Sequence, residues 1–252
     1  MKFASDLNLP AIIAHRGFKR KYPENTLIAF EAAIDAGADM IELDVTLSKD
    51  REVIVIHDDT LDRTSNGKGP VQQYRLAELK QFDAGSWFDP RFRGERIPTL
   101  GEVLDLVRNR ILLNVEIKTS AYESDSPPDS IEKQILRLVS LKGCLDSVLF
   151  SSFEPALLKG IVTVEKQSRI ALLTEKSLTK KAWEYCNNLG LFSWNPDYRS
   201  VTEGRVQEMH RKNIRVFPYT VNSLSDAKRQ IELGVDGFFT DDPSTMKNLL
   251  FY

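Results

Sequence analysis

The 252-residue sequence is poor in the residues and patterns that mark several common classes of protein. Its two cysteines, Cys144 and Cys186, lie far apart and lack the spacing of metal ligands, so we expect two reduced thiols and no disulfide framework. It has no apolar run of about 20 residues, the length that a membrane-spanning helix needs. The first residues also lack the apolar core of a signal peptide. We therefore expect a soluble, cytoplasmic protein.

An excess of charge of one sign is also missing. The chain has 34 Lys and Arg against 36 Asp and Glu, a net charge of -2, and no basic block. Binding to nucleic acid therefore has no electrostatic support. The composition, 42% hydrophobic and 28% charged, is typical of a globular domain with a substantial core. Nothing in these totals predicts an oligomeric state.

Strand-like and helix-like segments alternate along most of the chain. The expected strands are 10–14, 40–45, 111–117, 147–150, 169–173, 191–194, 215–219 and 237–240. The expected helices are 24–36, 99–108, 130–141, 155–164, 178–187, 202–211, 223–232 and 245–250. About eight strand-then-helix units predict a parallel sheet, and a chain of this length suits an α/β fold of the TIM (β/α)8 barrel type. A doubly wound open sheet is the alternative, weakened because no G-x-G-x-x-G follows the first strand.

One segment, residues 59–97, does not fit this alternation. It contains turn signals at 66–70, a short helical pattern at 76–82 and clustered aromatic residues, namely Phe82, Trp87, Phe88 and Phe92. A further extended run at 52–57 precedes it and continues the 40–45 strand or pairs with it. We predict one domain spanning residues 1–252, with a small insertion at approximately 59–97 after the second strand.

Two of the expected strands carry carboxylates on one face. Glu42 and Asp44 alternate with apolar residues in the 40–45 strand, and side chains two positions apart point the same way. The pattern recurs at 113–118, where Glu116 and Lys118 share a face. Three converging carboxylates would repel one another unless a hard divalent cation neutralised them. The alternative is that both faces are solvated faces of antiparallel strands.

Histidines and cations lie near the same strand ends. His15 follows the first expected strand and His57 ends the 52–57 run, which indicates acid–base chemistry where a barrel gathers its catalytic groups. The third histidine, His210, falls in an expected helix and is predicted to lie on the surface. Arg16 and Lys118 beside a carboxylate cluster suit an anionic substrate, and a phosphoryl group fits best. The alternative for Lys118 is a local pair that neutralises Glu116.

The sequence resembles the glycerophosphodiester phosphodiesterases over positions 10–243. The matching motifs are His15-Arg16-Gly17, Glu24-Asn25-Thr26, Glu42-Leu43-Asp44-Val45, His57-Asp58, Leu61-Asp62-Arg63-Thr64, Ile97-Pro98-Thr99-Leu100, Glu116-Ile117-Lys118, Ser151-Ser152-Phe153, Thr220-Val221-Asn222, Gly234-Val235-Asp236-Gly237 and Thr240-Asp241-Asp242-Pro243. Two positions depart from the family pattern: Tyr219 stands where Trp is usual, and Asp50-Arg51-Glu52 replaces an Asp-Gly turn. The first is expected to alter the pocket wall.

The resemblance implies a TIM barrel with an insertion after the second strand. It also implies roles for seven residues: metal ligands Glu42, Asp44 and Glu116, catalytic histidines His15 and His57, and phosphate contacts Arg16 and Lys118. The implied activity is hydrolysis of a small-molecule glycerophosphodiester to glycerol 3-phosphate and an alcohol, with Mg²⁺ or Ca²⁺ bound. Two alternatives stay open. One is a lysophospholipase D whose aromatic cluster meets an acyl chain, and the other is a non-catalytic phosphodiester-binding module.

Overall fold

Nine strands form one sheet in the computed structural model, which describes residues 7–175 and 189–250. The strands are β1 (Ala11–Ala14), β2 (Met40–Leu47), β3 (Val53–Val55), β4 (Leu112–Ile117), β5 (Val148–Ser152), β6 (Arg169–Thr174), β7 (Ser193–Pro196), β8 (Arg215–Val216) and β9 (Gly237–Thr240). Eight of them run parallel in the order β8-β7-β6-β5-β4-β2-β1-β9, and β3 pairs antiparallel with β2.

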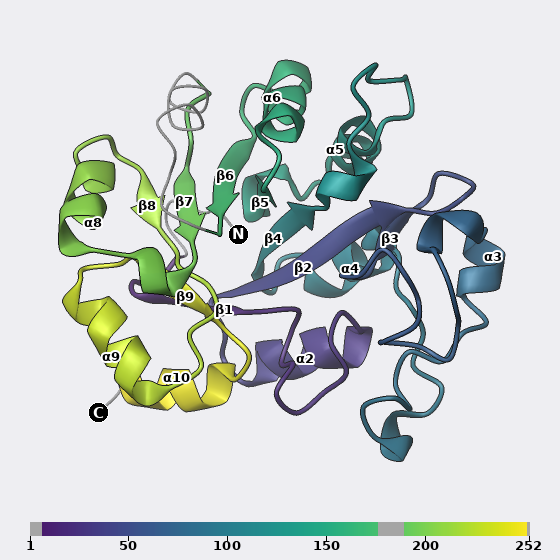
Figure 1. The fold of residues 1–252 in the computed structure, drawn as a ribbon, viewed down its shortest axis with the longest axis horizontal. Coiled ribbons are helices and arrows are strands. Elements are labelled where there is room, and N and C mark those ends of the chain that lie inside the picture. The colour runs from purple at the N-terminus through teal and green to yellow at the C-terminus, as the bar shows by residue number, and fades with distance from the viewer. Residues whose placement is uncertain (1–6, 176–188, 251–252) are drawn as a thin grey trace.

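The parallel strands curl into an almost closed ring with β8 and β9 at the seam (Figure 1). Across the seam the backbone N–H of Phe239 donates to the carbonyl of Pro218 at 2.9 Å, and that of Val221 donates to the carbonyl of Phe239 at 2.8 Å. Strand β1 lies between β2 and β9, so the two ends of the chain meet in the sheet. The predicted TIM barrel is confirmed, and an open doubly wound sheet is wrong.

Helices surround the ring (Figure 1). They are α2 (Leu27–Asp35), α3 (Leu76–Leu79), α4 (Leu100–Val107), α5 (Ile131–Leu141), α6 (Pro155–Val164), α8 (Glu203–His210), α9 (Leu224–Glu232) and α10 (Pro243–Leu250). Several of them begin after a side chain that caps the helix; the Thr99 hydroxyl, for example, accepts the backbone N–H of Glu102 to begin α4. The helix expected at 178–187 lies outside the described residues. In the described ranges no helix is long and apolar enough to cross a membrane.

The alternation of side chains along β2 separates core from site. Ile41, Leu43 and Val45 are fully buried in the main core between the sheet and the helices. Met40 belongs to a second cluster that fills the bottom of the barrel, together with residues such as Leu112 on β4. Because side chains two apart share a face, the side chains of Glu42 and Asp44 follow Met40 toward the carboxyl ends of the strands. The barrel interior is therefore apolar at its floor and charged at its mouth.

The insertion between β3 and α4 packs on the barrel through its own apolar cluster. Besides α3 it contains two 3₁₀ turns, η1 (Val71–Gln73) and η2 (Pro90–Phe92). Its cluster is made of Ile54, Ile56, Leu61, Val71, Leu79, Ala84 and Ile97. The Asp83 carboxylate accepts the backbone N–H groups of Gly85, Ser86 and Gly94 at 2.7–2.9 Å, which ties two turns of the insertion together.

The aromatic residues of the insertion join it to the loop before α2. The ring of Phe92 has its centroid 5.5 Å from that of Tyr22 and 5.8 Å from that of Phe88, and Trp87 lies edge-on to Phe88 at 5.7 Å. Phe18 continues the row at 5.8 Å from Tyr22. These contacts hold the insertion against the segment that follows β1.

Candidate active site

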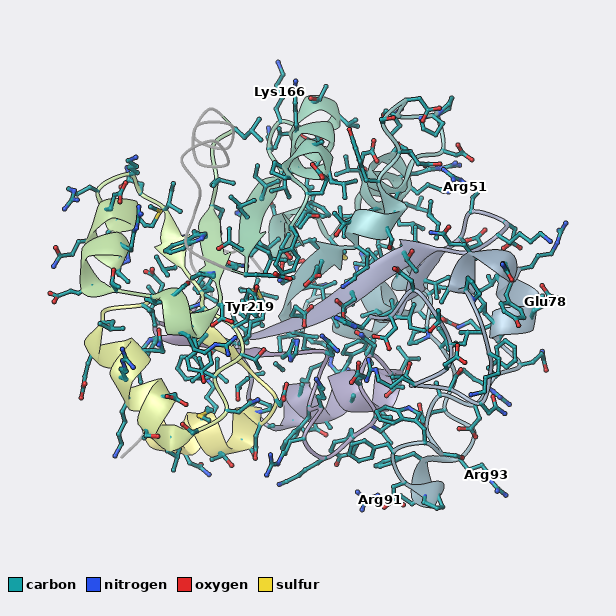
Figure 2. All side chains as sticks on the ribbon, viewed as in Figure 1. Arg51, Glu78, Arg91, Arg93, Lys166 and Tyr219 are labelled. Carbon is teal, nitrogen blue, oxygen red and sulfur yellow. The ribbon has the colours of Figure 1, made fainter. Side chains whose placement is uncertain are left out.

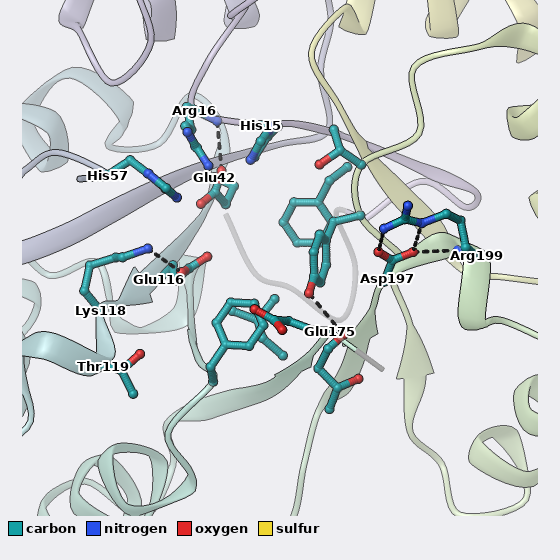
Figure 3. A pocket seen from close by; sticks show the side chains of 16 residues that line it. His15, Arg16, Glu42, His57, Glu116, Lys118, Thr119, Glu175, Asp197 and Arg199 are labelled. Carbon is teal, nitrogen blue, oxygen red and sulfur yellow. Dashed lines mark hydrogen bonds and ion pairs between the residues drawn. The ribbon is translucent and has the colours of Figure 1, made fainter. Parts of the chain in front are cut away.

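A pocket of about 1100 Å³ opens at the carboxyl ends of the strands. Six of the seven predicted site residues line it: His15, Arg16, Glu42, His57, Glu116 and Lys118. Asp44 lies immediately behind them, 1% exposed. Figure 3 shows the two histidines, Arg16 and Lys118 gathered around Glu42 and Glu116, with Glu175, Asp197 and Arg199 across the pocket.

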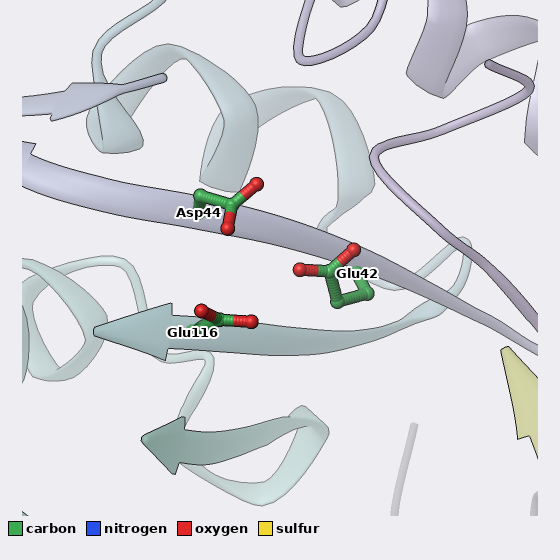
Figure 4. A group of neighbouring side chains, drawn as sticks. All are labelled: Glu42, Asp44 and Glu116. Carbon is green, nitrogen blue, oxygen red and sulfur yellow. The ribbon is translucent and has the colours of Figure 1, made fainter. Parts of the chain in front are cut away.

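The three carboxylates predicted from the strand pattern meet in space. In the parallel register of β2 and β4, Asp44 pairs with Glu116, and Glu42 lies two residues before Asp44 on the same face. Oxygens of all three lie within 4.8 Å of one another (Figure 4). Oε1 of Glu42 and Oδ1 of Asp44 are buried and have no hydrogen-bond partner among the described residues. Two buried carboxylate oxygens without hydrogen bonds, within an all-carboxylate set, suit a hard divalent cation.

The electrostatics of this cluster show the same need for positive charge. Burial, followed by repulsion from Asp44, raises the pKa of both Glu42 and Glu116. At Asp44 the effect of burial is outweighed by Arg16 and Lys118, which lower the pKa of that carboxyl. Without a further cation the cluster therefore favours protonation of the two glutamates.

Arg16 reaches the cluster from a turn in which two consecutive residues have positive φ angles. Arg16 has φ of +55°, and Gly17 after it has φ of +81°. A Cβ on Gly17 would lie 2.8 Å from backbone atoms of Ala29, so this position requires glycine. The turn aims the backbone N–H of Arg16 at Oε2 of Glu42, 2.8 Å away, and brings its Nε to 3.2 Å from Oδ2 of Asp44.

Lys118 approaches the carboxylates from the end of β4. Its Nζ lies 3.3 Å from Oε1 of Glu116 and 3.6 Å from Oδ1 of Asp44. Although burial opposes its charge, these two carboxylates raise the pKa of Lys118. The local pair with Glu116 that the sequence also allowed does form, and the same ammonium group faces the pocket. Pairing with Glu116 and availability to a pocket ligand are therefore compatible.

His15 is held by a residue from the far end of the chain. Its Nδ1 lies 2.6 Å from Oδ1 of Asp241, which follows β9. The other Asp241 oxygen accepts the side-chain amide of Asn222 at 2.9 Å. Burial lowers the pKa of His15 despite its Asp241 partner. Burial alone would raise the pKa of Asp241, but hydrogen bonding to His15 lowers it to about 2.

His57 is held by its own neighbour in the sequence. Its Nδ1 lies 2.6 Å from Oδ1 of Asp58, and both oxygens of Asp58 accept hydrogen bonds from Arg63 at 2.7 and 2.9 Å. Arg63 holds the pKa of Asp58 far below its usual range. Burial lowers the pKa of His57, although the nearby Asp44 opposes this. Both histidines in the pocket thus use Nδ1 for an aspartate, which leaves Nε2 for other partners.

Five residues that support the site lie within the sequence motifs but had no predicted role: Glu24, Asp58, Arg63, Asn222 and Asp241. For Asp58 a signal was present, because an aspartate directly after a strand-end histidine can bond it. For Asp241 the signal was its place after the last strand, which a closed barrel puts beside the first. His210 lies outside the pocket as predicted, with Nε2 2.8 Å from Oδ2 of Asp236.

The far wall of the pocket is aromatic. Phe153, Tyr219 and Phe239 line it in a row of edge-to-face contacts, with centroids 6.0 and 6.5 Å apart. Tyr219, labelled near the barrel centre in Figure 2, donates its hydroxyl to the carbonyl of Thr174 at 3.0 Å. Tyr219 thus forms part of the pocket wall, and its hydroxyl is hydrogen-bonded to the last residue of β6.

The aromatic cluster of the insertion does not form the mouth for an acyl chain that the lysophospholipase D alternative requires. Among the described residues that line the pocket, none comes from 59–97. Phe92 and Phe88 pack toward Tyr22, and Phe82 packs edge-on against Tyr74 at 5.3 Å. The cluster is packing between the insertion and its neighbours, and the observation that favoured a lysophospholipid substrate is lost.

The fold and this set of side chains are those of an α/β-barrel hydrolase. The model of the glycerophosphoryl diester phosphodiesterase family matches residues 15–245, and the chain belongs to that family. It is 38% identical over 240 residues to a glycerophosphodiester phosphodiesterase of Caldanaerobacter subterraneus subsp. tengcongensis, covering 95% of this chain and 97% of that protein. A second relative so named, from Bacillus altitudinis, is 39% identical over 236 residues, covering 92% and 94%.

Solved structures agree with these relatives. A phosphodiesterase of Oleispira antarctica, determined in complex with the product sn-glycerol-3-phosphate, superposes with a TM-score of 0.89 at 28% identity, covering 97% of this chain and 98% of that one. A glycerophosphodiester phosphodiesterase of Agrobacterium tumefaciens has a TM-score of 0.79 at 28% identity, covering 94% and 98%.

Proposed function

We propose that this protein hydrolyses glycerophosphodiesters to glycerol 3-phosphate and an alcohol, in the pocket described above. The observation that carries the proposal is the convergence of three clustered carboxylates, two of them buried, with two cations and two imidazoles at one cavity. This combination suits a phosphodiester: an anion to be bound, a proton to be removed and an alkoxide to be protonated. Family membership and the product held by the Oleispira antarctica relative support the same substrate class.

We assign Glu42, Asp44 and Glu116 as the ligands of a divalent cation, Mg²⁺ or Ca²⁺. Both ions prefer oxygen ligands, and the buried carboxylate oxygens that accept no hydrogen bond in the described structure fit that preference. A cation bound there would supply the positive charge that polarises a phosphoryl oxygen. The excess negative charge that raises the pKa of the two glutamates would then be neutralised.

Arg16 and Lys118 are assigned to the phosphate. Each already lies within 3.6 Å of a carboxylate of the cluster, so their charges are fixed near the place where a phosphate would bind. Arg16 is positioned further by its backbone bond to Glu42 and its ion pair with Glu24. Preorganised cations of this kind stabilise the charge that builds up in the transition state, and they need no reorganisation at that moment.

His15 and His57 are assigned to proton transfer. Their Nδ1 atoms are occupied by Asp241 and Asp58, which leaves each Nε2 to exchange a proton. One Nε2 removes the proton of the attacking hydroxyl, which belongs either to water or to the glycerol of the substrate. The other gives a proton to the oxygen of the departing alcohol. Each aspartate favours the tautomer with hydrogen on Nδ1 and steadies the imidazolium when it forms.

The test is release of glycerol 3-phosphate from glycerophosphocholine, measured with a coupled enzyme, with and without a chelator. We expect release with Mg²⁺ or Ca²⁺ present, loss of release after chelation, and recovery when the ion is returned. Absence of release from glycerophosphocholine and other glycerophosphodiesters would contradict the proposed activity. Full release after complete chelation would contradict the metal assignment alone.

A further inference from the structure

Arg63 belongs to the insertion and does not line the pocket. Its guanidinium nevertheless forms ion pairs with two carboxylates beside the site, those of Asp58 and Glu24. Its Nε and Nη2 donate to the two oxygens of Asp58 at 2.7 and 2.9 Å. Its Nη1 and Nη2 donate to the two oxygens of Glu24 at 3.0 and 2.8 Å. The planar fork of arginine allows two such bidentate contacts at once, which a lysine cannot reproduce.

Each of these carboxylates holds one group of the pocket. Oδ1 of Asp58 lies 2.6 Å from Nδ1 of His57, and Oε1 of Glu24 accepts Nη1 of Arg16 at 2.8 Å. An unbroken series of contacts thus runs from His57 through Asp58, Arg63 and Glu24 to Arg16. Both ends of the series line the pocket and face the carboxylate cluster (Figure 3).

We propose that Arg63 is a positioning residue through which the insertion fixes both His57 and Arg16 in the geometry for phosphodiester hydrolysis. The proposal rests on the function proposed above. Without Arg63, the Asp58 side chain would lose both of its guanidinium contacts and be free to turn away from Nδ1 of His57. Glu24 would likewise lose one of the two arginines between which it is held.

The surroundings of Arg63 indicate that the fold does not depend on it. Its side chain is 44% exposed and takes no part in the apolar cluster of the insertion. Other contacts hold the local turn, among them the backbone N–H of Gly69 bound to Asp62 at 2.9 Å. Glu24 is 2% exposed, and without Arg63 it keeps Arg16 at 2.8 Å and Lys19 at 3.8 Å, so its charge stays paired. Removal of Arg63 should therefore alter the site more than the stability.

The experiment compares Arg63→Ala and Arg63→Lys with Arg91→Ala. Arg91 is a matched control on the same insertion, at the tip labelled in Figure 2, where it stacks on Phe92 at 4.6 Å. With the divalent cation present and glycerophosphocholine as substrate, we expect kcat of Arg63→Ala to fall about 10-fold to 100-fold, the usual range for residues that orient catalytic groups. Arg63→Lys should recover only part of the loss, and Arg91→Ala should stay within about twofold of the wild type, as surface changes usually do.

Two further readouts separate positioning from a general loss of structure. Guanidinium at low millimolar concentration should restore several-fold activity to Arg63→Ala, because the vacated site is open to solvent, and should not stimulate the wild type or Arg91→Ala. Imidazole ¹⁵N spectra should show hydrogen on Nδ1 of His57 in the wild type and a mixture of tautomers in Arg63→Ala, with His15 unchanged. The chain has only three histidines, so these signals can be assigned by single substitutions.

An Arg63→Ala variant with wild-type kcat and unchanged His57 signals would overturn the proposal. A kcat loss that is accompanied by a lower unfolding temperature, and that neither guanidinium nor lysine reduces, would also overturn it by making Arg63 merely structural. If the wild-type enzyme releases no glycerol 3-phosphate, the proposed function fails, and the His57 spectra then decide the positioning role alone. Unchanged spectra in that case would overturn it.

Discussion

The two histidines of the pocket have similar contacts at Nδ1, but the chain brings each histidine and its aspartate together in a different way. His15 and Asp241 are 226 positions apart and meet because β1 and β9 pair where the barrel closes. His57 and Asp58 are neighbours in the sequence. The third group also differs: the neutral amide of Asn222 holds Asp241, whereas the cationic Arg63 of the insertion holds Asp58. The barrel by itself completes one histidine site, and the insertion completes the other.

This difference has a chemical consequence. Asp241, bound by an amide and with the ammonium of Lys19 as far as 4.0 Å away, keeps more of its negative charge toward the imidazole than Asp58, whose two oxygens are both bound by a guanidinium. The two imidazoles are therefore placed in unequal fields around one cluster of carboxylates. Inequality of this kind is what a pair of groups needs if one is to act as an acid and the other as a base.

Loss of any one cluster carboxylate should have the largest effect. Glu42→Gln, Asp44→Asn and Glu116→Gln each remove one of three oxygen donors, so the divalent cation should be poorly held. We expect nearly all turnover and its dependence on the cation to disappear, as measured by glycerol 3-phosphate release across a Mg²⁺ or Ca²⁺ titration. Asp105→Asn, an exposed partner of Lys142, serves as the control. Cation-dependent activity that persists in all three variants would refute the assignment.

Removal of either imidazole should come next. His15→Ala and His57→Ala are each expected to lower kcat by roughly 10²–10⁴-fold, the range for loss of a general acid or base. The double variant should lose less than the product of the two, because both groups act in one reaction. His210→Ala is a matched control, since His210 also contacts an aspartate but lies outside the pocket. A loss in His210→Ala as large as the others would mean that the effects are structural.

Replacement of Asp241 or Asp58 by asparagine should lower kcat by different factors at the two histidine sites. In Asp241→Asn, Asn222 donates to the new amide oxygen, so the NH₂ group must face His15 and oppose hydrogen on Nδ1. In Asp58→Asn, Arg63 donates to both positions, so the oxygen can still face His57. We expect losses in kcat of about 100-fold and about 10-fold respectively, within the range for such orienting residues. Steady-state kinetics should show this order, with exposed Asp62→Asn unaffected; the reverse order would break the comparison.

The smallest expected effect concerns stability in acid, to which each site contributes one carboxylate. Burial opposes the charge of Glu24, but Arg63 and Arg16 lower its pKa to about 2, and the pKa of Asp241 is also about 2. A lowered pKa in the folded state adds stability above the unfolded pKa, near 4, and that stability is lost as the pH falls toward 2. Glu24 would contribute up to about 3 kcal/mol in this way.

Urea unfolding between pH 7 and pH 2.5 measures this contribution. Glu24→Gln and Asp241→Asn should each flatten the fall in stability below pH 4.5 by up to about 1.4 kcal/mol per pH unit, the slope that one proton gives. Exposed Asp35→Asn should leave the slope unchanged. Slopes equal to that of the wild type in both site variants would show that neither carboxylate is held as described.

Much of the barrel could be predicted because its strands and helices repeat a local pattern. The periodicity gave β2, β4 and α6 nearly to the residue. Strand β8 covers only Arg215–Val216 and is shorter than the expected 215–219, although the backbone N–H groups of Phe217 and Tyr219 still donate to Trp194 and Pro196 of β7. Contacts between distant segments were harder to predict from the sequence. The aromatic row to Tyr22 depends on how the insertion packs, which periodicity does not encode.

The same division holds within the site. Glu42, Asp44 and Glu116 could be brought together from the sequence, since alternation along two adjacent parallel strands places them on one face. The groups that hold the two histidines were harder to predict, because most of them come from distant parts of the chain. Asp58 was adjacent to His57 in the sequence, but the link through Arg63 to Glu24 spans 39 residues and emerges only from the folded insertion.

The central claim is that two unequal imidazoles act on one phosphodiester, one as acid and one as base. Its most direct test compares His15→Ala and His57→Ala on glycerophosphocholine and on a p-nitrophenyl diester of glycerol 3-phosphate, whose leaving group needs no proton. We predict that the p-nitrophenyl substrate largely restores kcat in one variant, which identifies the general acid, and fails to restore it in the other. If neither variant responds to the leaving group, the two-histidine mechanism is wrong, and both imidazoles are better described as phosphate-binding groups.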